Sequence, residues 1–104
     1  MILTTAMSVE GRAVSEYLGI ANSQAIMGVS MGRDIKALGR SISGGRSGAY
    51  EEEVAKGVEE ALRELEENAT KLGADALIAV DVDYAEVGNN MLMVAATGTA
   101  VKLA

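Results

Sequence analysis

The feature that most constrains the fold is a helical pattern of apolar residues across positions 49–72. The apolar residues recur at spacings of three and four, on one stripe of an amphipathic helix: Val54, Val58, Ala61, Leu65, Ala69 and Leu72. Lys71 in the last turn and Gly73 just after it are typical of a helix C-terminus. Such a helix is about 35 Å long. It overhangs any sheet that 104 residues can build, so we expect its far end to pack on a neighbouring subunit.

Four other segments have the composition of β-strands, and they lie at residues 1–5, 12–27, 74–84 and 91–102. Gly19 indicates a bulge in the second of them. In the third, strict alternation places Ile78 and Val80 on one face and Asp81 and Asp83 on the other. The last two strands should pair as an antiparallel hairpin.

A second, shorter helix is expected over residues 32–41, so the predicted element order is β-β-α-α-β-β. The sequence therefore predicts a single α+β domain over residues 1–104, in which a small antiparallel sheet packs on one long helix.

Composition excludes several classes of function. The chain has no Cys and no His, which removes thiol chemistry, the usual catalytic triads and the commonest transition-metal ligands. We therefore expect no enzymatic activity. A net charge of −6 disfavours nucleic acid and anionic membrane surfaces as partners. Without a signal-peptide pattern or an apolar run of about 20 residues, the sequence predicts a cytoplasmic protein.

Two carboxylates on one strand face form a candidate cation site. Asp81 and Asp83 lie about 6.8 Å apart along the predicted strand. Together with Glu16 or Asp75 they would offer oxygen ligands to a hard divalent cation such as Ca²⁺, Mg²⁺ or Mn²⁺. The alternative is structural, with both aspartates facing solvent or pairing with basic side chains.

The run GGRSGAYE, at residues 44–51, precedes and enters the long helix and forms a second candidate site. Free backbone N–H groups and the helix dipole could bind an anion there. The alternatives are a structural turn or a contact between subunits. The residues concerned are Gly44, Gly45, Arg46, Ser47, Gly48, Tyr50 and Glu51.

Several runs of the sequence carry a resemblance to a known family: VSEYLG at 14–19, GGRSGAYE at 44–51, and the segments 73–84 and 90–101. On these runs the chain resembles the YbjQ-like family of bacteria and archaea over nearly its whole length. The resemblance implies a dodecin-like subunit, with a curved antiparallel sheet against one long helix, that assembles as a homo-oligomeric ring, a pentamer. The family is labelled heavy-metal-binding and has no assigned activity. Soft heavy metals favour Cys and His, both of which this chain lacks.

The sequence thus predicts a homo-oligomeric YbjQ-like protein, with cation binding as the leading biochemical hypothesis. Two alternatives stay open at this point. One is a structural or interaction ring without a ligand, and the other is an anion or small-ligand binder that uses the GGRSGAYE turn at subunit boundaries.

Overall fold

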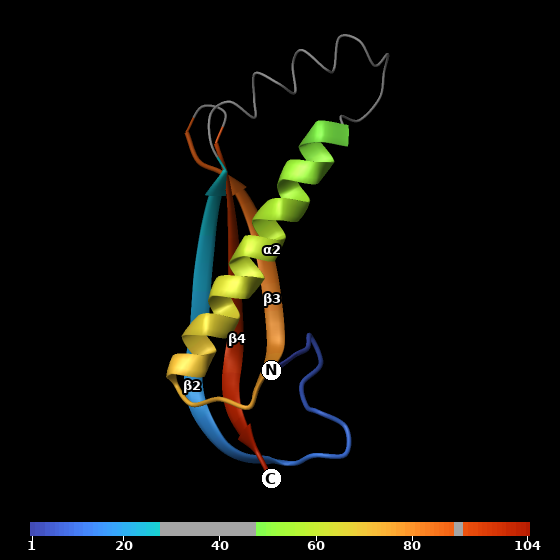
Figure 1. Ribbon diagram of the computed structural model, residues 1–104, viewed down its shortest axis with the longest axis vertical. Helices are drawn as coiled ribbons and strands as arrows, with labels where there is room; N and C mark the ends of the chain where they lie inside the picture. The colour runs from blue at the N-terminus through green and yellow to red at the C-terminus, as the bar shows by residue number, and fades with distance from the viewer. Residues whose placement is uncertain (28–47, 89–90) are drawn as a thin grey trace.

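The computed structural model describes residues 1–27, 48–88 and 91–104 (Figure 1). Their elements follow one another as β1 (Ile2–Leu3), β2 (Val14–Met27), α2 (Gly48–Lys71), β3 (Ala76–Glu86) and β4 (Leu92–Leu103). The predicted long helix, the bulge beside Gly19 and the β3–β4 hairpin are confirmed. The shorter helix predicted at 32–41 lies outside the described residues.

The strands of the described residues form one mixed sheet in the order β1-β3-β4-β2. β4 pairs antiparallel with β2 and β3, whereas β1 pairs parallel with β3 at Ile2 and Leu3. The prediction of a wholly antiparallel sheet is therefore wrong at β1. A two-residue strand has too short a pattern to reveal its direction, and the chain crosses from β1 to β2 at the opposite edge of the sheet.

Helix α2 crosses one face of the sheet and buries its apolar stripe there (Figure 1). Leu65, Leu77 and Val94 are completely buried in this layer. Leu72 belongs to the predicted stripe but follows the last helical residue, and it is exposed. The shortest dimension is 16 Å and the radius of gyration 16.9 Å, against about 13 Å for a compact domain of this length. The molecule is a thin, elongated slab of two layers.

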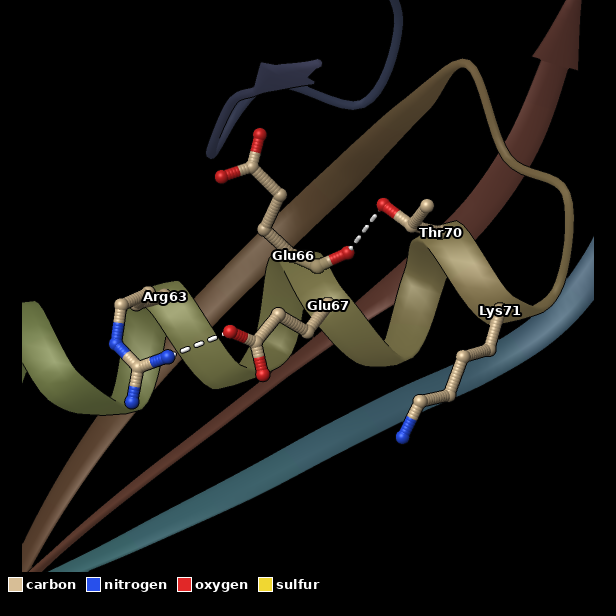
Figure 2. A pocket seen from close by; sticks show the side chains of 5 residues that line it. All are labelled: Arg63, Glu66, Glu67, Thr70 and Lys71. Carbon is tan, nitrogen blue, oxygen red and sulfur yellow. Dashed lines mark hydrogen bonds and ion pairs between the residues drawn. The ribbon is translucent and has the colours of Figure 1, made fainter.

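The outward face of α2 carries ion pairs between neighbouring turns. Arg63 contacts Glu60 at 2.7 Å, at i,i+3 spacing, and Glu67 at 2.5 Å, at i,i+4 spacing. Figure 2 shows the contact with Glu67. These carboxylates raise the pKa of Arg63 above its ordinary value, with the Glu60 hydrogen bond the largest cause. These charged side chains of α2 therefore form a solvated, ion-paired helix face.

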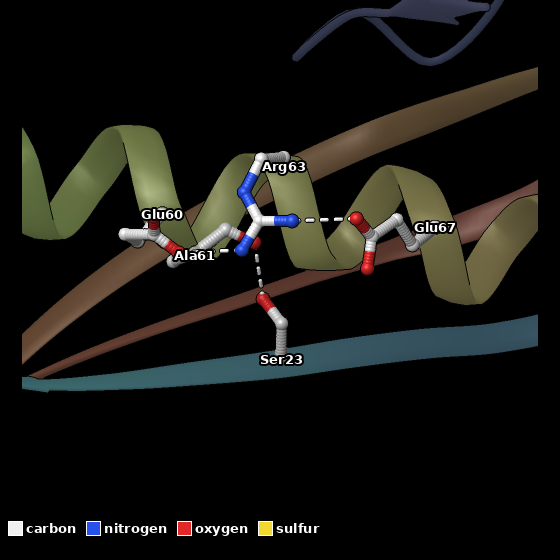
Figure 3. Close-up of polar contacts among 5 residues, drawn as sticks. All are labelled: Ser23, Glu60, Ala61, Arg63 and Glu67. Atoms are coloured by element: carbon white, nitrogen blue, oxygen red, sulfur yellow. Dashed lines mark hydrogen bonds and ion pairs between the residues drawn. The ribbon is translucent and has the colours of Figure 1, made fainter.

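A buried hydrogen bond fixes α2 on the sheet. The Ser23 hydroxyl of β2 donates to the Ala61 carbonyl of α2 at 2.5 Å (Figure 3). Close approach nearby depends on Gly57, where a β-carbon would lie 2.9 Å from a methyl group of Val94. Small residues on both elements thus let the helix backbone sit close to β2 and β4.

A β-bulge at Ala79 inverts which side chains of β3 point toward α2. Pairing with β4 shifts between Ile78 and Asp81, and Ala79 takes a φ of 51°. As a result Leu77 and Val80 both pack in the core beneath α2, while Ile78 packs in a small cluster on the opposite face. The prediction that Ile78 and Val80 share a face is wrong, because one extra residue in a strand inverts the alternation.

Replacing Ala79 by glycine is expected to raise the free energy of unfolding by about 0.5–1 kcal/mol. A left-handed φ costs a residue with a β-carbon about 1–2 kcal/mol, and glycine's greater freedom in the unfolded chain offsets only part of that gain. Urea unfolding of A79G measures the change. The matched variant A85G, at a position on the same strand without positive φ, should lose stability, and a destabilised A79G would contradict this account.

Replacing Ser23 by alanine is expected to lower the free energy of unfolding by about 1–2 kcal/mol, since it removes a buried hydrogen bond between layers. The matched control is S15A, whose exposed hydroxyl donates to the Lys102 carbonyl at 3.2 Å. Denaturant unfolding should show a loss below about 0.5 kcal/mol for S15A. Equal losses in the two variants would contradict a special role for Ser23.

Candidate functional site

Asp81 and Asp83 lie on the face of β3 that points away from α2. Their neighbour Val82 packs against the core beneath the helix, so alternation directs both aspartates to the other side. Both are exposed. Across the sheet they pair in register with Thr97 and Ala95 of β4. The structure therefore brings these two predicted site residues together on an open surface.

The two carboxyl groups interact directly. A side-chain hydrogen bond with Asp81 is the largest cause that raises the pKa of Asp83 above its ordinary value, followed by the negative charge of Asp81 and a small effect of burial. The pair thus holds a proton more tightly than an isolated aspartate does. A cation bound between these oxygens would relieve the same repulsion.

Asp75 and Glu16 lie elsewhere. The Asp75 carboxylate accepts a hydrogen bond from the backbone N–H of Leu103 at 2.9 Å, which gives it a structural role at the end of the sheet. Glu16 pairs in register with Lys102, five residues and about 17 Å along β4 from Thr97. Within the part of the chain that the structure describes, no three residues of the Asp, Glu, His or Cys type gather to hold a metal ion.

The second candidate site lies mostly outside the described residues, as Gly44, Gly45, Arg46 and Ser47 all do. Gly48 begins α2, and Tyr50 belongs to its first turn. Glu51 is exposed in the same turn. The structure thus places the end of the GGRSGAYE run at a helix N-terminus.

Polar residues that were not predicted as site residues extend the aspartate pair across the open face. Asn22 of β2 lies in register with Thr97, which itself pairs with Asp81. Gln24 of β2 lies in register with Ala95, which in turn pairs with Asp83. These amides and the Thr97 hydroxyl form polar rows with the carboxylates. The alternating pattern of β2 places Asn22 and Gln24 on one face. Their alignment with the two aspartates depends on how β2 and β3 each pair with β4, which the sequence does not show.

A groove of about 490 Å³ beside α2 is lined by Arg63, Glu66, Glu67, Thr70 and Lys71 (Figure 2). Glu66 pairs with the amino group of Met1 at 3.2 Å, and the Thr70 hydroxyl donates to the Glu66 carbonyl. Arg63 and Glu67 pair with each other. The lining groups thus largely satisfy one another, and the i,i+3 and i,i+4 spacing of their charges was visible in the sequence.

Across residues 1–27, 48–88 and 91–104, the structure contains no helix with both the length and the apolar character needed to span a bilayer.

Comparisons with known proteins identify the relatives of the chain. A family model described as YbjQ, "Putative heavy-metal-binding", matches residues 1–104. A UPF0145 protein of Halalkalibacterium halodurans is 50% identical over 103 residues, which cover 99% of this chain and 96% of the relative. A UPF0145 protein of Geobacillus thermodenitrificans is 48% identical over 103 residues, covering 99% of each chain.

A solved structure supports the same α+β fold. The crystal structure of a protein of unknown function of the DUF74 family, from Pediococcus pentosaceus, matches with a TM-score of 0.61. The match covers 100% of this chain and 98% of that one at 19% identity, so the likeness is one of fold. With the whole-chain family match and relatives at about half identity, the chain belongs to the YbjQ-like, UPF0145 family.

Proposed function

We propose that the chain is the subunit of a homo-oligomeric assembly that binds a hard divalent cation through Asp81 and Asp83. The observation that carries the proposal is the contact between these two carboxyl groups on an exposed sheet face. Among the described residues, neither aspartate has an ion pair with a basic side chain. Their mutual repulsion therefore favours a cation.

The donor set decides which cations fit. Two carboxylates supply only oxygen ligands, which suit Mg²⁺, Ca²⁺ and Mn²⁺. Soft heavy metals prefer thiolate and imidazole, and the sequence contains neither Cys nor His. The aspartate pair thus fits a hard cation and does not fit a soft heavy metal. Hard cations take six or more ligands, so water or a second copy of the chain would complete the shell.

Assembly is supported by apolar surface that one subunit leaves open. Ile20 is 76% exposed and Ile26 is 55% exposed, both on the sheet face away from α2. The slab-like shape also leaves little core per residue. We propose a ring of five copies, as the YbjQ-like resemblance implies, with a cytoplasmic location and no enzymatic activity as parts of the same proposal.

Cation titration tests the proposal. Isothermal calorimetry with Mg²⁺, Ca²⁺ and Mn²⁺ on protein prepared without chelator should give a dissociation constant of about 0.1–1 mM. D81N/D83N should weaken binding at least about tenfold, since neutral amides lose the charge attraction. E52Q/E59Q, on exposed positions of α2, removes the same charge and should bind normally.

Native mass spectrometry of the same samples reports the subunit number and any bound metal. A cation that binds the wild type and D81N/D83N equally well would overturn the aspartate site. An assembly that binds no cation would favour the ligand-free ring. Binding of phosphate in its place would favour the anion site at the GGRSGAYE turn.

The raised pKa of Asp83 predicts how stability depends on pH. A carboxyl whose pKa is higher in the folded state than in the unfolded state opposes folding once it is ionised, so its unfavourable contribution grows as pH rises through that pKa. D83N removes the repulsion and should melt at or above the wild-type temperature at pH 7.

The difference between D83N and the wild type should shrink toward about pH 3, below the raised pKa of Asp83, because the Asp83 carboxyl takes up a proton there. Thermal unfolding at the two pH values measures it. E86Q, at an exposed position of the same strand, serves as the control and should track the wild type. A lower melting temperature for D83N at pH 7 would contradict the assigned repulsion.

A further inference from the structure

Strand β2 is an edge strand whose backbone α2 contacts at Asn22, where the Asn68 side chain donates a hydrogen bond to the carbonyl at 2.8 Å. The sheet order places it at one end, and among the described residues no strand pairs with its outer side. Residues 17–27 contain no charged residue and no proline. Tyr17, Ile20 and Ile26 are large and exposed there. Natural proteins blunt free edges with charges, prolines or covering segments, so a neutral edge of this length indicates a strand partner.

The other free edge of the sheet belongs to β3. β1 pairs with β3 only at Ala76 and Leu77, and backbone hydrogen bonds from the following loop extend to Val80. Beyond that point, residues 81–86 pair with β4 on one side, and the described residues supply no strand for the other. This edge is acidic, because it carries Asp81, Asp83 and Glu86.

The two free edges match in direction. β2 and β3 both run antiparallel to β4, so they are parallel to each other. A rotated copy of the subunit can therefore continue the sheet by placing its β3 beside β2 of the first copy. Such a head-to-tail contact generates a ring when the rotation closes.

The two edges also match in chemistry on the open face. The register places these residues on that face, in chain order: Ile20, Asn22, Gln24 and Ile26 on β2, and Ile78, Asp81, Asp83 and Ala85 on β3. Each series is apolar at its ends and polar in the middle. The β2 side chains are carboxamides, which donate hydrogen bonds, and the β3 side chains are carboxylates, which accept them.

We propose that β2 of one subunit pairs edge to edge, in parallel, with residues 81–86 of β3 in a second copy of this chain. Asn22 then lies beside Asp81 of the next copy, Gln24 beside its Asp83, and Ile26 beside its Ala85. This inference rests on the proposed assembly and names the strands that form it. Pairing removes both free edges at once, and the amides compensate carboxylates that repel each other within one subunit.

Near-isosteric charge variants test the contact. N22D/Q24E sets carboxylates against carboxylates, and sedimentation velocity at about 10 μM should show at least a tenfold rise in the fraction of free subunit. Both side chains are exposed, so circular dichroism should be unchanged. T5E/S8D adds the same charge at exposed positions of the N-terminal loop and should leave the assembly intact.

A variant that exchanges the charges between the two strands provides the decisive test. In N22D/Q24E/D81N/D83N the donors and acceptors trade places, and the oligomer should return. D81N/D83N alone keeps amide hydrogen bonds across the contact and should remain assembled while its cation binding is lost. An oligomer that N22D/Q24E leaves intact, or that the exchange does not restore, overturns the strand assignment while the proposed assembly stands.

A wild-type chain that sediments as a monomer overturns both the strand pairing and the assembly, whatever its cation affinity. If N22D/Q24E fails to fold, amide hydrogen exchange on the wild-type oligomer decides. The amides of residues 20–27 that point away from β4 should then exchange as slowly as those of β4. Rapid exchange along that edge would overturn the pairing.

Discussion

Burial of the α2 stripe on one face of the sheet is the contact on which the rest of the structure depends. Ala61, Leu65 and Ala69 have no exposed surface, and they lie over completely buried residues of β3 and β4. Small side chains bring the helix backbone close enough for the Ser23 hydroxyl to reach the Ala61 carbonyl. Across residues 1–27, 48–88 and 91–104, α2 is the helix that packs on the sheet, and it covers one side. On the other side, the described residues place polar side chains and the N-terminal loop.

The open face is divided in a way that follows from this constraint. At one end, Val9 and Val14 pack on a small cluster that includes Ile78 and Val101. Beyond that cluster the face is exposed, and the polar rows through Asp81 and Asp83 lie there. The bulge at Ala79 separates these two regions: it turns Ile78 toward the covered end while keeping Val80 beneath α2. Backbone geometry at one residue therefore decides what the two aspartates face.

Local patterns predicted the elements well, because a long helical stripe and a glycine-marked bulge at Gly19 are encoded within short stretches of sequence. The parallel direction of β1 and the bulge at Ala79 could not be read in this way. An alanine in an apolar strand gives no sign of a left-handed φ, and Ile2 and Leu3 suit either direction. Asp81 and Asp83 were predictable as neighbours because they lie on one face of one strand. The distance of Asp75 and Glu16 from this pair depends on the register between strands, which only the assembled sheet defines.

The chemistry of the open face follows from the need to compensate two adjacent carboxylates. A proton, a divalent cation or the carboxamides of a neighbouring strand can each do so, and the three differ in what they require. A shared proton dissociates as pH rises, and amides need a second copy in register. A hard cation needs further oxygen ligands, which Asn22 and Gln24 of a neighbouring β2 also carry. Cation binding and edge pairing therefore involve the same carboxylates without excluding each other, since two carboxylates offer about eight lone-pair sites. Soft metals gain nothing from this arrangement, because every donor in it is oxygen or amide nitrogen.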